Sequence, residues 1–254
     1  DYKYSVIFTC DDFSSTLKKA KEIIPLENTY ENDYLYTSFV KPVAYSMDGY
    51  YFLKFNLAYA AIHPLTQEEF LTKYPFLVVF HEKGELIEFR FDVLKRVFLS
   101  DKKEPTIYSN LIAEMSDYFK EHFECDLIPL NLDFMVNVCK RDENVKLIAQ
   151  SMKLPNGGNA QLDVGNNQEY ILPFIGELRS LLNDNQAELE KVPDFREALE
   201  QFMFEMEEMS DYPWIELLWE NEIKTRSNRV KFVFNYMNKS YCLIQYYYSN
   251  VLIG

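Results

Sequence analysis

The chain has 254 residues, of which 48% are hydrophobic and 16% aromatic, so its composition is that of a globular protein with a sizeable core and excludes a disordered chain. Its formal net charge of −14 disfavours nucleic-acid binding over the whole surface, because a field of that sign repels a phosphate backbone. With 7 glycines and no stretch of about 20 apolar residues, the sequence also gives no sign of a glycine-rich phosphate-binding loop or of a membrane span.

The first sixty residues predict a strand, a helix and a hairpin. Residues 2–10 alternate apolar and polar side chains, which indicates a strand. Residues 11–25 follow as a helix, capped by one of its two leading aspartates and stopped by Pro25. Residues 34–46 and 50–62 flank a turn that ends in Asp-Gly, which is typical of a β-hairpin.

The next segment predicts a helix followed by a second hairpin. Thr66 with Glu69 three residues later is a capping-box pattern, so we expect a helix that ends near Pro75. Residues 76–80 and 85–93 are β-favouring runs joined by a short turn, which predicts a hairpin. One face of its second strand would carry Ile87, Phe89 and Phe91, and the other face would carry Leu86, Glu88 and Arg90.

Residues 104–123 predict an amphipathic helix, because large apolar side chains recur at i, i+3 and i+4 spacing. The buried stripe of this helix would consist of Tyr108, Leu111, Ile112, Met115, Tyr118 and Phe119. Residues 124–172 are harder to assign, and 155–168 within them is loop-like because it holds three of the seven glycines. Two further helices follow, over 173–184 and 194–209.

The segment 184–211 is strongly acidic, with ten Asp and Glu against two Lys and Arg. The helix at 194–209 within it nevertheless carries a row of large apolar side chains, which we interpret as a core face. The predicted core face consists of Phe195, Leu199, Phe202, Met203 and Met206.

The last part of the chain predicts strands. Residues 214–222 alternate in a strand pattern, and 232–250 holds two aromatic-rich runs around a four-residue turn, which predicts a β-hairpin. Cross-strand aromatic and β-branched pairs stabilise such a hairpin by roughly 0.2–1 kcal/mol each. Because an isolated hairpin is marginally stable, we expect it to pack on the helix at 194–209, with its rings directed into the core.

Together these elements predict an α+β protein with mostly antiparallel sheets and helices packed on one side. We expect two lobes, 1–125 and 126–254, with a boundary anywhere between residues 100 and 168 because no Pro- or Ser-rich linker marks it. The absence of an initiator Met and the abrupt apolar end lead us to expect a piece of a longer protein.

The four cysteines lie far apart in apolar surroundings and show no CxxC or ligand-like spacing. They are Cys10, Cys125, Cys139 and Cys242. This pattern predicts reduced thiols and an intracellular, cytoplasmic protein.

No motif in the sequence predicts catalysis, a cofactor or a metal site. The three histidines, His63, His81 and His122, have no partner at metal-ligand spacing, so we expect surface or capping roles for them. The NGGN run at 156–159 lacks the pattern of a phosphate-binding loop and is interpreted as a plain loop.

A metal-dependent nuclease or hydrolase is one alternative. Such nucleases use carboxylates to hold Mg²⁺ and a lysine near the attacking water, and Asp194 followed by Glu222 and Lys224 supplies these residue types. The chemistry needs acids on adjacent strand positions, whereas Asp194 suits a helix cap better. Glu88 with Arg90 is a weaker version of the same pattern, with Arg in place of Lys.

A nucleic-acid-binding module is another alternative. From residue 222 to the end, five Lys and Arg stand against a single acid, so the C-terminal hairpin could offer a basic, aromatic-interleaved patch to phosphates or stacked bases. The residues of this basic patch are Lys224, Arg226, Asn228, Arg229, Lys231 and Lys239. The same charges could instead form salt bridges with the acidic helix or lie on a solvated face.

The main hypothesis is a non-enzymatic, intracellular interaction module that belongs to a larger protein or a multi-subunit assembly. It would bind a protein partner, or a second copy of itself, through sheet edges and aromatic surface.

Overall fold

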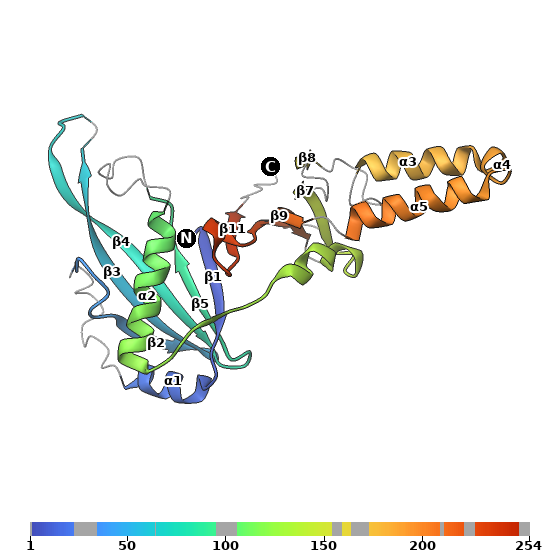
Figure 1. The fold of residues 1–254 in the computed structure, drawn as a ribbon. Helices are drawn as coiled ribbons and strands as arrows, with labels where there is room; N and C mark the ends of the chain where they lie inside the picture. The colour runs from blue at the N-terminus through green and yellow to red at the C-terminus, as the bar shows by residue number, and fades with distance from the viewer. Residues whose placement is uncertain are drawn as a thin grey trace. The chain divides into compact units, whose positions relative to one another are not determined.

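The computed structural model describes residues 2–22, 35–63, 65–94, 106–153, 159–163, 173–208, 211–220 and 227–248. The chain forms two compact units. The first unit comprises residues 1–131 and 235–244, and the second comprises 132–234 and 245–254. Helices accompany antiparallel strands in both units, so the predicted α+β class is confirmed (Figure 1).

The first unit is built on an antiparallel sheet with the strand order β2-β3-β4-β5-β1. Its strands are β1 (Tyr4–Thr9), β2 (Val43–Met47), β3 (Tyr50–Ile62), β4 (Glu69–His81), β5 (Leu86–Phe91) and the short β6 (Ile128–Pro129), which pairs with β1. Both predicted hairpins of this unit are confirmed, since β2 pairs with β3 and β4 pairs with β5. Asp48 and Gly49, with φ of 50° and 82°, form the tight turn between β2 and β3.

Helices α1 (Phe13–Lys21) and α2 (Ile107–Phe123) lie against one face of this sheet (Figure 1). Of the two aspartates at the start of α1, Asp12 is the cap, because its Oδ1 accepts a hydrogen bond from the Ser15 backbone N–H at 2.9 Å. The predicted stop at Pro25 lies outside the described residues. Among the described residues, no helix has the length and apolar character needed to cross a membrane.

The core of the first unit lies between α2 and the sheet. Phe119 of α2 packs against Phe80 and Phe89, with ring centroids 5.9 and 5.6 Å apart. All three rings are buried, as are the β5 neighbours Ile87 and Phe91, so the alternation predicted for β5 is confirmed on this face. Burial of each such side chain contributes roughly 1.5–3 kcal/mol, so the interface between α2 and the sheet is a main source of stability for this unit.

The predicted helix from Thr66 to Pro75 is wrong, because residues 69–75 belong to strand β4. The Thr66 hydroxyl accepts a hydrogen bond from the Glu68 backbone N–H at 3.4 Å, so this residue stabilises the turn between β3 and β4 instead of capping a helix. A Thr hydroxyl readily accepts a hydrogen bond from a nearby backbone N–H, and at Thr66 this tendency stabilises a turn where the sequence pattern predicted a helix cap.

Pro75 fits in strand β4 because its missing N–H is not needed there. It lies opposite Asn56 of β3, and the Asn56 carbonyl accepts a hydrogen bond from the Tyr36 N–H on the other side of β3. Asn56 and Pro75 are therefore a non-hydrogen-bonded pair, and a donor at Pro75 would point away from β3. On that side the pairing with β5 begins only at Phe76, so the proline breaks no ladder hydrogen bond.

The second unit contains an antiparallel sheet with the strand order β10-β9-β7-β8. Its strands are β7 (Val145–Lys153), β8 (Asn159–Asp163), β9 (Asp211–Glu220) and β10 (Ser227–Val233). Its helices are η2 (Asp133–Lys140), α3 (Pro173–Asp184), α4 (Gln186–Leu189) and α5 (Pro193–Glu208). Ile215 and Leu217 of β9 are fully buried, and Glu216 between them is buried as well, so burial does not alternate along this part of the predicted strand.

The aromatic-rich C-terminal hairpin is present as β10 and β11 (Leu243–Tyr248), which are hydrogen-bonded neighbours. The connection between them is longer than the predicted four-residue turn and contains the short helix η3 (Tyr236–Asn238). Alternate side chains along the two runs are buried: Val230, Phe232 and Phe234 in the first, and Cys242 and Ile244 in the second. Tyr246 and Tyr247 are half-buried, so these two rings are only partly covered.

Candidate protein-interaction surface

The helices α3 and α5 of the second unit lie side by side, with α4 at their joined end (Figure 1). Pro193 begins α5, where its missing N–H is one that a helix leaves unpaired in any case. Met203 of α5 is buried against Met152 of β7, and Leu178 and Leu182 of α3 pack on the same cluster. One side of α5 is therefore anchored to α3 and β7.

The predicted core face of α5 is wrong for its aromatic members. Phe195 is 59% exposed and Phe202 is 44% exposed, whereas Met203 is 3% exposed. The reason is geometric, because adjacent helical positions differ by about 100° and burial of Met203 turns Phe202 away from the anchor. Leu199 is half-buried, and the Met206 side chain lies outside the described residues.

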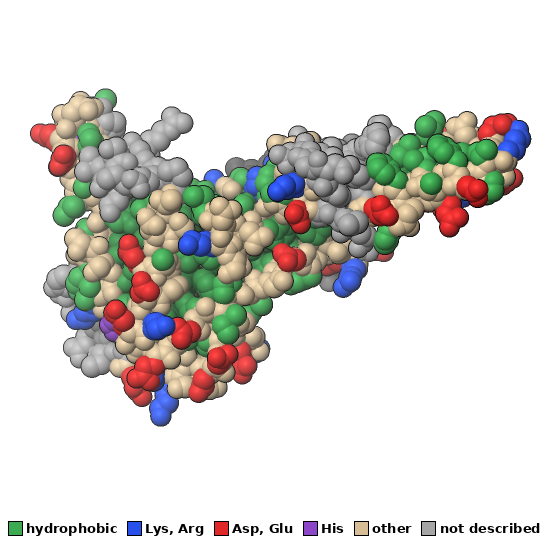
Figure 2. All heavy atoms as spheres, in the orientation of Figure 1, with side chains coloured by type: hydrophobic (Ala, Val, Ile, Leu, Met, Phe, Trp, Pro, Cys, Tyr) green, Lys and Arg blue, Asp and Glu red, His purple; other side chains and the backbone are tan. Residues whose placement is uncertain are grey.

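Phe195, Leu199 and Phe202 share one side of α5 because they follow i, i+4 and i+7 spacing; we call them the α5 stripe. Phe204 is also 56% exposed, but its position is rotated by about half a turn from Phe195. Figure 2 shows hydrophobic side chains along the α3 and α5 region with acidic side chains beside them. An apolar row of this kind on a helix surface is typical of a contact site for another protein.

The surroundings of the α5 stripe are acidic. Asp194, Glu197 and Glu205 of α5 are exposed. The segment 184–211 has a net charge of −8, from ten acids and two bases. Both bases are paired within the segment: Lys191 with Glu188 at 2.7 Å, and Arg196 with Glu200 at 2.8 Å. The stripe therefore lies in a region of strongly negative potential.

The basic patch predicted on the C-terminal hairpin is partly described. Lys224 and Arg226 lie outside the described residues. Asn228 of β10 and Lys239 after η3 are exposed. The Lys231 ammonium lies over the Trp214 ring, 3.6 Å from its centroid, which is a cation–π contact within the second unit.

Acidic side chains of β9 accompany the cations on this sheet. The Arg229 guanidinium forms an ion pair with Glu216, which is buried on β9, and Lys146 of β7 pairs with Glu220 at 2.8 Å. Salt bridges were one expectation for the basic residues, and Arg229 forms one with an acid of β9. Binding of nucleic acid through this hairpin stays a prediction.

The residues of the nuclease hypothesis are only partly described. Asp194 is exposed in the first turn of α5, and Glu222 and Lys224 lie outside the described residues. Glu88 and Arg90 form an ion pair on β5. Within the described part of the chain, no group of three or more His, Cys, Asp or Glu side chains is placed to hold a metal ion.

An ion cluster in the first unit was not predicted from the sequence. Glu88 is 2% exposed, and its Oε2 lies 2.7 Å from Arg90 Nη2 and 2.9 Å from His81 Nε2. Burial alone would raise the pKa of Glu88, but the hydrogen bonds from His81 and Arg90 outweigh it and lower the pKa below its ordinary value. The alternation of side chains along β5 was enough to predict that Glu88 and Arg90 share one face. The contact of His81 with Glu88 depends on how β4 pairs with β5, which the sequence pattern does not give.

The other two histidines have local roles. His63 Nδ1 accepts a hydrogen bond from the Thr66 backbone N–H at 3.2 Å, which stabilises the turn after β3. His122 Nδ1 lies 3.1 Å from the Tyr118 carbonyl oxygen within α2.

In comparisons with known proteins, no protein-family model and no curated protein sequence matches the chain.

Proposed function

We propose that the chain is a protein-interaction module whose α5 stripe binds a basic amphipathic helix of a partner protein. The observation that carries this proposal is the exposure of Phe195 and Phe202 on one side of a helix that is anchored through Met203 on an adjoining side, about 80–100° around the helix from the two rings. A partner helix with its own apolar row can pack against such a ridge, as helices do in grooves and bundles. We place the module in a larger protein or a multi-subunit assembly.

The energetic case rests on the two aromatic rings. Full burial of a Phe side chain contributes roughly 1.5–3 kcal/mol, and about half of each ring is still exposed, so covering both adds about 1 kcal/mol each. Rings of this kind, on a rigid element and surrounded by polar residues, are the usual sites where truncation weakens a complex.

The charge of the segment selects the partner. A helix that carries Lys and Arg beside its apolar row would place those cations near Glu197, Glu205 and their acidic neighbours. The complementary charges would speed association and orient the two helices, while an acidic helix of the same apolar pattern would be repelled.

The test uses a synthetic amphipathic helix of about six turns, with Leu in heptad positions and Lys elsewhere, labelled for fluorescence anisotropy. A peptide of the same composition in scrambled order has the same charge and no apolar row. We expect the wild-type chain to bind the amphipathic peptide at least about 10-fold more tightly than the scrambled one, because the stripe adds more than 1.4 kcal/mol.

The decisive variant is the double substitution Phe195→Ala with Phe202→Ala, for which we expect the affinity to fall about 10- to 30-fold. Phe204→Ala is the matched control, since it removes an equally exposed ring from the same helix on another side. Equal affinity of wild type for both peptides, or an equal loss in the control and the double variant, would overturn the proposal.

A further inference from the structure

Two cysteines that are far apart in the sequence come together in the first unit. Cys10 follows strand β1 and Cys125 follows helix α2. Thr9 pairs with Ile128 in the β1–β6 ladder, which places Cys10 beside the segment that contains Cys125. The Leu130 N–H donates to the Ile7 carbonyl oxygen at 3.0 Å and holds the same two segments together.

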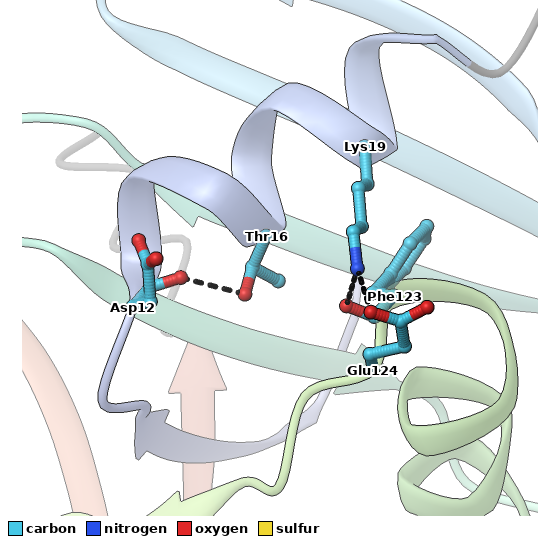
Figure 3. A network of polar contacts seen from close by, with 5 residues as sticks. All are labelled: Asp12, Thr16, Lys19, Phe123 and Glu124. Carbon is cyan, nitrogen blue, oxygen red and sulfur yellow. Dashed lines mark hydrogen bonds and ion pairs between the residues drawn. The ribbon is translucent and has the colours of Figure 1, made fainter.

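Helix α1 supplies a hydroxyl that both thiols approach. The Cys10 Sγ lies 3.8 Å from Thr16 Oγ1, and the Cys125 thiol lies near enough to Thr16 and Cys10 for both to influence its pKa. The Thr16 hydroxyl donates to the Asp12 carbonyl oxygen at 2.8 Å, so its oxygen is free to accept from a thiol (Figure 3).

The position of Cys125 is fixed by the preceding residues. Lys19 of α1 donates to the Phe123 carbonyl oxygen at 3.1 Å and to Glu124 Oε2 at 2.6 Å, as Figure 3 shows. Glu124 has a left-handed backbone with φ of 52°, which turns the chain sharply after α2. The end of α2 is thus tied to α1 one helical turn after Thr16, and Cys125 comes next.

We propose that Cys10 and Cys125 are a redox modification site, at which a low-molecular-weight disulfide such as glutathione disulfide converts the two thiols into an intramolecular disulfide. Both are free thiols in this structure. The bond would covalently link the start of α1 to the end of α2, two elements that already contact each other.

The reaction has two exchange steps. The thiolate of Cys10 attacks one sulfur of glutathione disulfide, that S–S bond breaks, and one glutathione leaves as a thiolate that takes up a proton. The thiolate of Cys125 then attacks the Cys10 sulfur of the mixed disulfide, and the second glutathione leaves in the same way. Two protein thiols are oxidised, one glutathione disulfide is reduced to two thiols, and the two protons of the protein thiols end on glutathione.

Exposure sets the order of the two steps. Cys10 is half-exposed and can meet the reagent, whereas Cys125 is buried. The pKa of Cys125 is raised to about 12, mainly because the thiol is buried and in part because Cys10 lies beside it. Because the second step needs the Cys125 thiolate, we expect disulfide formation to become faster as the pH rises from 7 to 9.

The test treats the full chain with glutathione disulfide, blocks the remaining thiols with N-ethylmaleimide under denaturing conditions and maps the peptides by mass spectrometry. We expect a peptide pair linked through Cys10 and Cys125, lower in mass than its two thiol peptides by two hydrogen atoms and separated by dithiothreitol. Cys242, which is also buried, should carry maleimide.

Two variants complete the test. Cys10→Ala should abolish the linked pair and leave Cys125 as a free thiol, while Cys242→Ala should leave the linked pair unchanged. The mapping of the wild-type chain is decisive even where a variant folds poorly. Glutathione held on Cys10 without a second exchange, no reaction at all, or linkage to another cysteine would each overturn the proposal.

Discussion

Helices α2 and α5 carry the same kind of apolar row and have different surroundings. The row of α2 is covered by the sheet of the first unit, and Leu111, Met115 and Phe119 are buried. The row of α5 has the same helical spacing, yet Phe195 and Phe202 remain exposed because α5 is anchored through Met203 on a different side. Periodicity therefore identifies a helix and the face it can bury, whereas burial depends on which other element comes to meet that face.

The strongest test of this difference is a truncation in α2. Phe119→Ala removes a ring that contacts Phe80, Phe89 and Phe123 in a closed core, so the free energy of unfolding should fall by about 3–5 kcal/mol. Urea unfolding monitored by circular dichroism measures this loss. A loss below about 1 kcal/mol would mean that α2 is not held on the sheet as described.

A second test concerns the face of β5 opposite to Phe89. Glu88→Gln leaves Arg90 and His81 without a carboxylate, and we expect a loss of about 2 kcal/mol at pH 7, since Arg90 is partly exposed and can be hydrated. Arg90→Met retains much of the side-chain volume and serves as the complementary variant. Stability of Glu88→Gln equal to wild type at pH 7 would contradict the ion cluster.

The pH dependence of the same variant gives a further check. The folded-state pKa of Glu88 is lowered, so its stabilisation is fully present above its ordinary value of 4.5 and is lost as the pH falls through the folded pKa. We therefore expect the stability difference between wild type and Glu88→Gln to shrink below about pH 4.5. Urea midpoints of both proteins measured from pH 7 to pH 3 test this. A stability difference that grows as the pH falls would contradict the lowered pKa of Glu88.

A smaller effect is expected at the start of α1. Asp12→Ala removes the cap of Ser15 and should cost about 1 kcal/mol, whereas Asp11→Ala should cost little because Asp11 is exposed and is not the cap. The two thermal unfolding midpoints can be compared directly. If both variants lose the same stability, the assignment of the cap is wrong.

The smallest stability effect is expected on the α5 stripe itself. Phe195→Ala and Phe202→Ala remove rings that are about half exposed, so each should lower the unfolding free energy by about 1 kcal/mol or less. Measured with Phe119→Ala in the same urea series, this result would complete the contrast between the two helices. A loss of 2 kcal/mol or more at either ring would place the stripe in a core.

Local patterns predicted much of the first unit. The apolar spacing of α2 and the alternation of β5 are properties of neighbouring residues, and both led to the observed elements. The pattern of Thr66 and Glu69 misled because a Thr hydroxyl that captures a nearby N–H serves a turn as well as a helix, and Pro75 is compatible with a strand whose neighbour ends beside it.

The functional features depend on contacts that no local pattern contains. His81 and Glu88 meet through the β4–β5 register, and Cys10 and Cys125 meet because β1 pairs with the segment after α2. The exposure of Phe195 and Phe202 was missed for a related reason, since the row was correctly found but the side of α5 that is anchored is set by Met152 of a distant strand. The sequence already held two signals of this surface, the apolar row of α5 and the acidic charge around it.

Hydroxyl-radical footprinting of the chain, alone and with the basic amphipathic peptide, tests the central claim most directly, because it reports the exposure of individual rings. In the free chain we predict strong oxidation of Phe195, Phe202 and Phe204 and little oxidation of Phe119. With saturating amphipathic peptide, Phe195 and Phe202 should become protected while Phe204 stays reactive. Unchanged oxidation of Phe195 and Phe202 at saturating peptide, or weak oxidation of both in the free chain, would contradict the account.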